Sequence, residues 1–183
     1  MKFKELSLKG VFEIETNSFE DSRGAFFRSF CQEEFSVIRP DITFVQLNQS
    51  INYNKGTLRG MHYQIPPKAE DKLIRCIKGE VYDVIIDLRK DSPTFLKWTS
   101  LVLSSKKNNL IFIPKGFAHG FITLEDDSQL IYHHTEFYNN EYERGLNFKD
   151  PLINIDWGID VKVVSEKDMS YPYIDNNFEG IKL

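Results

Sequence analysis

The chain has 183 residues, of which 41% are hydrophobic and 14% aromatic, and its formal net charge is −4. This apolar content excludes intrinsic disorder, and the length fits one domain over residues 1–183. The slightly acidic balance offers no overall basic field, so neither nucleic acid nor a membrane surface is expected as a partner.

The first residues and the cysteines bear on the compartment. The segment MKFKELSLKG alternates charged with apolar residues and lacks the apolar stretch of a secretory signal, which favours a cytoplasmic location. The longest apolar runs, such as Leu110–Ile113, fall far short of the ~20 residues that cross a bilayer. The cysteines, Cys31 and Cys76, form neither a disulfide framework nor a CxxC pair, so we interpret them as reduced thiols.

Short segments rich in β-branched and aromatic residues recur between turn signals and predict strands. In chain order they are Val11–Thr16, Thr43–Tyr53, Leu73–Ile77, Glu80–Leu88, Lys97–Leu103, Leu110–Ile113 and Gln129–Phe137. Helix is scarce: we expect one at Gln32–Ile38 and a turn near Ser165–Asp168. The pattern predicts an all-β sandwich or barrel with a few short peripheral helices.

The segment EVYDVIIDL, residues 80–88, alternates between two kinds of face. Its even-numbered residues from Tyr82 to Leu88 are apolar and are predicted to face the core. Its odd-numbered residues mix aliphatic side chains with Asp83 and Asp87. That second face fits the mouth of a cavity and fits a solvent-facing side equally well.

Two histidines follow glycine-containing bends within β sequence: His62 in TLRGMHYQ and His119 in IPKGFAHGF. The second segment contains P-x-G-x-x-H, which resembles the second motif of the cupin superfamily of small β-barrels. Metal-binding cupins carry H-x-H and a Glu in the first motif, because a transition ion needs several converging imidazole and carboxylate ligands. Here Gln64 replaces the second histidine and no carboxylate follows before Glu70, so we predict a barrel without a metal. A lone histidine in a strand can also be a hydrogen-bonded structural residue.

A longer series of motifs extends the likeness over most of the chain. It comprises DSRGAFF, QLNQS, LRGMHYQ, KLIRCIKGEVYDVIIDLRKDSPTF, IPKGFAHGF and SEKD. From about Phe19 to Asp168 the chain resembles the 3,5-epimerases that act on dTDP-4-keto-6-deoxyglucose in rhamnose biosynthesis. The resemblance implies a metal-free cupin jelly roll without a cofactor, which binds a nucleotide-diphosphate sugar for surface polysaccharide or deoxysugar biosynthesis.

The resemblance also implies a catalytic set. Epimerisation beside a ketone needs a base on one face, stabilisation of the enolate, and an acid on the other face. By position, His62 would be the base and Asp168 would orient its imidazole. Lys72 would stabilise the enolate oxygen, and Tyr132 would donate a proton from the opposite face.

Substrate-binding residues follow from the same match. Arg23 and Arg59 would clamp the diphosphate with their guanidinium groups. Further binding roles would belong to Gln46, Asn48 and His119, which complete the polar lining, and to Tyr138, which would stack on the base. Strict alternation puts Arg59 and His62 on opposite faces of a strand, so we expect a bulge at Gly60 to bring them together.

Each role has a structural alternative that the residues leave open. Lys72 can be a strand-flanking charge, and Asp168 can cap a helix, because SEKD has the S-x-x-D form. Tyr132 and Tyr138 can be aromatics that fill the core or the rim. The remaining histidines, His133 and His134, gain nothing from the resemblance and are interpreted as surface or supporting residues.

The resemblance implies a homodimer in which an N-terminal residue of one subunit enters the other subunit's site. The aromatic segment with Phe26, Phe27 and Phe30 fits this expectation, because a second chain would cover its apolar area.

Departures from the rhamnose enzymes leave the nucleotide, the sugar and the number of inverted centres open. Arg28 stands where Glu is usual, Leu47 where Asp is common, and Gly158 where Pro is usual. The alternatives are a metal-free 3,4-ketoisomerase and a non-catalytic cupin that binds a sugar or nucleotide. A binding module would not need an acid and a base together, which favours an enzyme.

Overall fold

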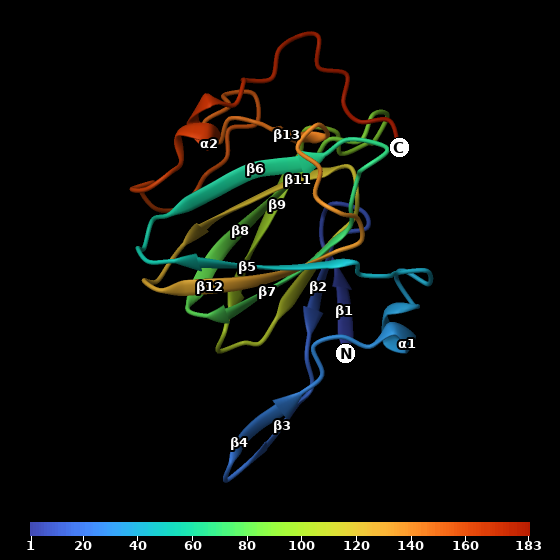
Figure 1. The fold of residues 1–183 in the computed structure, drawn as a ribbon, viewed down its shortest axis with the longest axis vertical. Coiled ribbons are helices and arrows are strands. Elements are labelled where there is room, and N and C mark those ends of the chain that lie inside the picture. The colour runs from blue at the N-terminus through green and yellow to red at the C-terminus, as the bar shows by residue number, and fades with distance from the viewer.

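The computed structural model describes all 183 residues and consists mainly of antiparallel strands in two sheets (Figure 1). The larger sheet, in spatial order, contains β1 (Lys2–Glu5), β2 (Phe12–Glu15), β10 (Leu110–Ile113), β7 (Lys72–Lys78), β12 (Ser128–His134) and β5 (Gln46–Asn52). The smaller sheet contains β13 (Glu143–Gly145), β6 (Leu58–Gln64), β11 (Phe117–Thr123), β8 (Glu80–Asp87) and β9 (Trp98–Ser104). The predicted all-β jelly roll is confirmed.

Most predicted elements lie where the sequence puts them. Strand β10 matches its predicted segment residue for residue, whereas β12 ends at His134, earlier than predicted. The predicted helix is shorter than expected, since α1 covers only Gln32–Phe35, and the predicted turn near Ser165 contains the helix α2 (Glu166–Ser170). Strand β1, with its sequence KFKE, was missed because charged residues leave little β signal in so short a segment.

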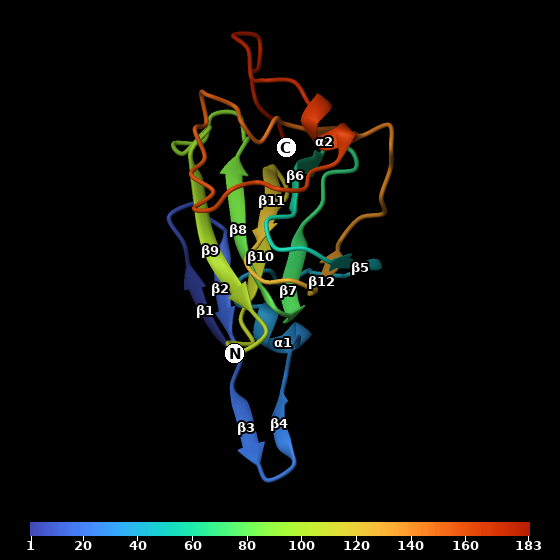
Figure 2. The same cartoon turned by 90° about the vertical axis from the view of Figure 1, so that its left-hand side faces the viewer.

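A separate hairpin of β3 (Ser18–Asp21) and β4 (Gly24–Phe27) projects from the body of the molecule (Figures 1 and 2). Its aromatic residues Phe19 and Phe26 are 74% and 77% exposed. Folding of one chain therefore leaves these two aromatic side chains in water.

The interior is divided among three apolar clusters. One cluster lies between the sheets and takes residues from both, among them Ile74 of β7 and Ile85 of β8. A second lies on the other face of the smaller sheet, where residues such as Phe148 and Trp157 from the C-terminal part cover it. The third lies beneath α1, whose Phe35 packs on the larger sheet. The outer face of the smaller sheet is thus covered by the C-terminal part, whereas the outer face of the larger sheet is covered only over β2, β10 and β7.

Both faces of strand β8 are buried, one between the sheets and the other beneath the C-terminal part. Val84 and Ile86 face the C-terminal cover, while Val81 and Ile85 face the space between the sheets. The solvent-facing alternative for the mixed face is therefore wrong. Asp83 is fully buried on that inner face, where it hydrogen-bonds His119 of β11. Among the helices, none has the length and apolar character that crossing a membrane requires.

Candidate active site

A pocket of about 280 Å³ opens at the polar end of the space between the sheets. Both sheets contribute walls: β6 and β11 on one side, and β5, β7 and β12 on the other. The predicted site residues that line it are Asn48, Arg59, His62, Lys72, His119, Tyr132 and Tyr138. Residues from distant parts of the sequence therefore meet here as the resemblance implied.

The other predicted site residues lie around or away from the pocket. Gln46 is adjacent: its side chain donates to Asn48 Oδ1 over 3.3 Å and accepts from the Tyr138 backbone N–H over 3.0 Å. Arg23 is not brought to the pocket within one chain. It lies in the projecting hairpin, where it pairs with Asp21 over 2.6 Å and its side chain is 89% exposed.

A bulge brings Arg59 and His62 to the same face of β6. On β11, His119 opposes His62 and Phe121 opposes Arg59, so three steps along β6 match two steps along β11. Gly60 lies within the bulge with φ +128, and a Cβ there would come within 2.6 Å of Gly120 Cα. Only glycine fits this conformation and this contact, which explains why the bend has that residue.

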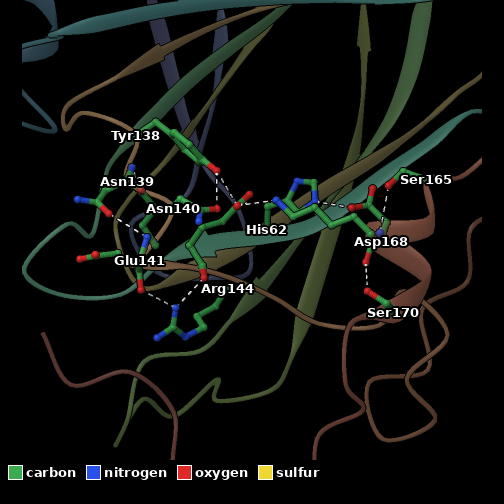
Figure 3. Close-up of polar contacts among 12 residues, drawn as sticks. His62, Tyr138, Asn139, Asn140, Glu141, Arg144, Ser165, Asp168 and Ser170 are labelled. Atoms are coloured by element: carbon green, nitrogen blue, oxygen red, sulfur yellow. Dashed lines mark hydrogen bonds and ion pairs between the residues drawn. The ribbon is translucent and has the colours of Figure 1, made fainter.

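His62 is held by Asp168 of α2 on one side, as Figure 3 shows. Its Nε2 lies 2.7 Å from Asp168 Oδ1, while Asp168 Oδ2 accepts the Gly60 backbone N–H over 3.1 Å. Burial opposes ionisation of Asp168, but the hydrogen bonds from His62 and Gly60 hold its pKa below the ordinary value. Capping of α2 falls to Ser165, whose Oγ accepts the Asp168 N–H. The carboxylate is thereby free to serve the histidine.

His119 and Asp83 form a second pair, deeper than the first. His119 Nε2 lies 2.8 Å from Asp83 Oδ2, and the side chains are 7% and 0% exposed. Burial raises the pKa of Asp83, and its Oδ1 has no hydrogen-bond partner. The pair forms part of the inner wall. Its carboxylate, Asp83, is stabilised less as an anion than Asp168 is.

Tyr132 faces this wall from the larger sheet. Its hydroxyl lies 2.9 Å from Ser50 Oγ on β5, and its ring centroid lies 6.4 Å from that of His119. Burial raises the pKa of Tyr132 well above that of a free phenol. The phenol therefore retains its proton at neutral pH and can donate it only to a strong base.

Lys72 stands beside Tyr132 on the same wall and has a buried counter-ion. Its Nζ lies 3.3 Å from Glu70 Oε1, and Glu70 Oε2 lies 2.8 Å from His134 Nδ1. The side chains of Lys72, Glu70 and His134 are 8% to 11% exposed. Of the two interpretations of His134, the surface one is therefore wrong, because the residue is largely buried and lines the pocket with Glu70.

The rim of the pocket carries a further ion pair. Glu143 accepts the Tyr138 hydroxyl over 2.9 Å and the Lys167 ammonium over 2.5 Å, so it joins the Tyr138 loop to α2. Burial opposes its ionisation, but Lys167 and Tyr138 lower the pKa of Glu143. Tyr138 itself is 53% exposed, which leaves its ring free to stack on a ligand.

Gln64 occupies the place of a second metal ligand and is used otherwise. Its amide donates to Lys68 O over 3.0 Å and accepts from the Asn139 N–H over 2.7 Å. No group of three or more His, Cys, Asp and Glu side chains in the molecule is arranged to hold a metal ion.

The geometry supports proton transfer at a carbon atom. A histidine oriented by a carboxylate lies on one wall, and a phenol with a lysine lies on the opposite wall. The family model of dTDP-4-dehydrorhamnose 3,5-epimerase matches residues 5–176. The chain belongs to this family.

Relatives of known name support the assignment. A dTDP-4-dehydrorhamnose 3,5-epimerase from Shigella flexneri is 44% identical over 161 residues, which cover 87% of this chain and 88% of the relative. A 3,5-epimerase from Legionella pneumophila, solved with dTDP-4-keto-L-rhamnose, superposes with a TM-score of 0.92 at 34% identity and covers 100% of this chain and 98% of its own. A 3'-monoepimerase from Streptomyces bikiniensis, solved with dTDP-quinovose, gives 0.87 at 30% identity, with 92% and 85% covered.

Within this epimerase family member, the three departures lie outside the pocket lining. Arg28 pairs with Glu34 over 2.6 Å, Leu47 is 62% exposed, and Gly158 has open space around its Cα. Leu47 points away from the pocket because it alternates with Asn48, which lines it. The departures therefore do not change the residues of this chain that line the pocket.

The alternation of side chains along a strand could have identified some of the pocket residues that the sequence prediction missed. His134 and Tyr132 are two apart on one strand, so they share a face, and the same holds for Ser50 and Asn48. Glu70 precedes β7 in a loop, where no periodicity applies, and only the structure reveals its contacts with Lys72 and His134.

Proposed function

We propose that this protein is an isomerase that epimerises C3, C5 or both in a dTDP-linked 4-keto-6-deoxyhexose during deoxysugar biosynthesis. The observation that carries the proposal is the placement of His62 with Asp168 on one wall and Tyr132 with Lys72 on the other. We further propose that the protein acts as one domain in the cytoplasm, without a metal or cofactor.

The hydrogen bond to Asp168 defines which nitrogen of His62 acts as the base. An ionised carboxylate only accepts hydrogen bonds, so Nε2 carries the proton that is shared with Asp168. Nδ1 of the neutral ring then has the free lone pair that removes a proton from the carbon next to the ketone. Asp168 stabilises the imidazolium that results.

The opposite wall receives the charge and returns a proton. Negative charge moves from the carbon to the ketone oxygen, where the Lys72 ammonium stabilises it. Tyr132 then donates its proton to the carbon from the other face, which inverts the centre. The raised pKa of Tyr132 matches this task, because a carbanion is a strong enough base to take its proton and water is not.

The nucleotide end of the ligand would meet the polar residues near the mouth. Arg59 donates through Nε to Asn52 Oδ1 over 2.7 Å, which leaves its terminal nitrogens for phosphate oxygens. Gln46 and Asn48 would supply hydrogen bonds there, and Tyr138 would stack on the base. His119 would complete the polar lining further in, on the inner wall.

We propose that the protein works as a homodimer. The outer face of β5 exposes Leu47 and Ile51, at 62% and 47%, and the projecting hairpin exposes Phe19 and Phe26. A second copy would cover such apolar area and would allow Arg23 to reach the partner's pocket. Light scattering at micromolar concentration tests this, since a fully active monomer would contradict it.

Isotope exchange tests the reaction itself. Incubation with dTDP-4-keto-6-deoxyglucose in D2O should place deuterium at C3 or C5, as read by NMR, with inversion of at least one centre. Exchange should persist after chelation. The CDP- and GDP-linked substrates define nucleotide preference, and movement of the carbonyl to C3 would instead identify a ketoisomerase. Absence of exchange with every substrate would favour the binding module.

Tyr132→Phe separates exchange from inversion in the same assay. His62 can still remove the proton and return a deuteron on the same face, so exchange should continue while inversion is lost at one position at least. Inversion at the parental rate would show that the acid lies elsewhere.

A further inference from the structure

The mechanism above uses Lys72 but not Glu70 and His134, the two largely buried residues that are linked to it. Glu70 has no role in the proton transfers, yet its side chain is only 8% exposed and contacts two pocket residues. A carboxylate is costly to bury unless it is paired, so its position calls for an explanation. Although burial raises it, the charge of Lys72 and the hydrogen bond from His134 leave the pKa of Glu70 below the ordinary value.

The contacts form a continuous chain across three strands. Gln46 donates to Asn48 Oδ1, and Asn48 Nδ2 lies 3.5 Å from His134 Nε2. His134 Nδ1 lies 2.8 Å from Glu70 Oε2 and must donate there, because an ionised carboxylate only accepts. Lys72 completes the chain at Glu70 Oε1 over 3.3 Å.

The sheet register holds the ends of this chain together. His134 of β12 is the cross-strand partner of Lys72 on β7 and of Gln46 on β5. The three backbones are thus fixed side by side, and Glu70 is the one member that comes from a loop. Its carboxylate bridges the lysine and the histidine, and so limits where the flexible Lys72 side chain can place its charge.

We propose that Glu70, held by His134, is a positioning residue that aims the Lys72 ammonium at the ketone oxygen. The inference rests on the proposed function, since it assigns a purpose to Lys72 in enolate formation. Glu70 supplies the counter-charge that keeps this ammonium in a largely buried site before substrate arrives. When the enolate forms, Lys72 shares its hydrogen bonds between Glu70 and the new negative charge.

A double-mutant cycle tests the proposal in the full-length enzyme. Glu70→Gln should lower kcat about tenfold or more while KM changes less than about threefold, because the lysine acts on the transition state. In a Lys72→Met background the same change should cost less than about twofold, because there is no ammonium left to aim. Glu136→Gln is the matched control: Glu136 pairs with Lys68 over 3.2 Å outside the pocket lining and should leave kcat unchanged.

His134 provides an independent arm. His134→Asn keeps an N–H donor near the place of Nδ1 and should retain kcat within about threefold, whereas His134→Leu should lose about as much as Glu70→Gln. His133→Asn, on the other face of β12, is its control. Unchanged affinity for dTDP shows that the variants are folded; if Glu70→Gln does not fold, the His134 pair decides.

The outcomes separate the two proposals. A parent enzyme with no exchange at C3 or C5 would refute the proposed function. An active parent in which Glu70→Gln has parental kcat, or loses equally with and without Lys72, would refute only the positioning role. Parental kcat in His134→Leu would refute the part of His134.

Discussion

Two histidine–aspartate pairs lie side by side at this pocket, and their histidines differ mainly in exposure. His62 and His119 are cross-strand partners on β6 and β11, and each bonds an aspartate through Nε2, over 2.7 and 2.8 Å. The His62 side chain is 33% exposed and that of His119 only 7%. The His62 side chain is thus accessible to a ligand, whereas the His119 side chain is almost completely enclosed.

The carboxylates differ more than the histidines. Asp168 accepts one further hydrogen bond, from the Gly60 N–H, and its pKa is lowered. Asp83 has one oxygen without a partner, and its pKa is raised. Asp168 is therefore suited to stabilise an imidazolium, while Asp83 gains little from being charged. The difference indicates that the number of hydrogen bonds to the carboxylate, not the histidine–aspartate motif alone, decides which pair can support a base.

The largest effect is expected from removing the exposed histidine. His62→Asn should abolish deuterium wash-in beside the ketone, a loss of about a thousandfold or more, while dTDP-sugar affinity stays within about tenfold. Affinity persists because a base acts on the transition state rather than on the bound substrate. NMR in D2O measures the first quantity and calorimetry the second. Retained exchange would break the comparison by removing His62 from its role.

Asp168→Asn is expected to have the next largest effect. The amide can no longer stabilise the imidazolium, so turnover should fall about tenfold or more although the fold persists. Circular dichroism checks the fold, and Ser165 still caps α2, because its Oγ accepts a backbone N–H. An unchanged rate would mean that Asp168 has only a structural part.

The two histidine–aspartate pairs show which features of the site could be predicted from the sequence and which could not. The bulge at Gly60 follows from the spacing of Arg59 and His62 once both are required in one pocket, and the structure has it. The partnership of His62 with Asp168 spans 106 residues, so only the family resemblance could suggest it. No periodic pattern reports which polar atom inside a barrel lacks a partner, since this depends on packing from several strands.

Asp83→Asn should change turnover less than Asp168→Asn does, by under about fivefold. The amide oxygen can still accept from His119, and a neutral group avoids the cost of burying a charge with one oxygen unpartnered. The melting temperature at neutral pH should therefore rise or stay within about 2 °C of the parent. A loss of turnover as large as that of Asp168→Asn would show that the enclosed pair also takes part in charge stabilisation.

The smallest effect is on stability, where the two aspartates should respond to pH with opposite signs. The lowered pKa of Asp168 means that its stabilising contribution is present above the unfolded value, near ~3.9, and is lost as pH falls through the folded value. The raised pKa of Asp83 means that the folded state favours the protonated carboxyl, so its ionisation destabilises the fold as pH rises, and acid removes this penalty.

Between about pH 7 and pH 3.5, Asp168→Asn should flatten the fall in melting temperature, and Asp83→Asn should steepen it, each by roughly 2–4 °C. Differential scanning fluorimetry of both variants and the parent, in one buffer series at constant ionic strength, measures these slopes. Slopes that shift in the same direction would mean that the two carboxylates have similar environments, and would contradict the difference in hydrogen bonding inferred for them.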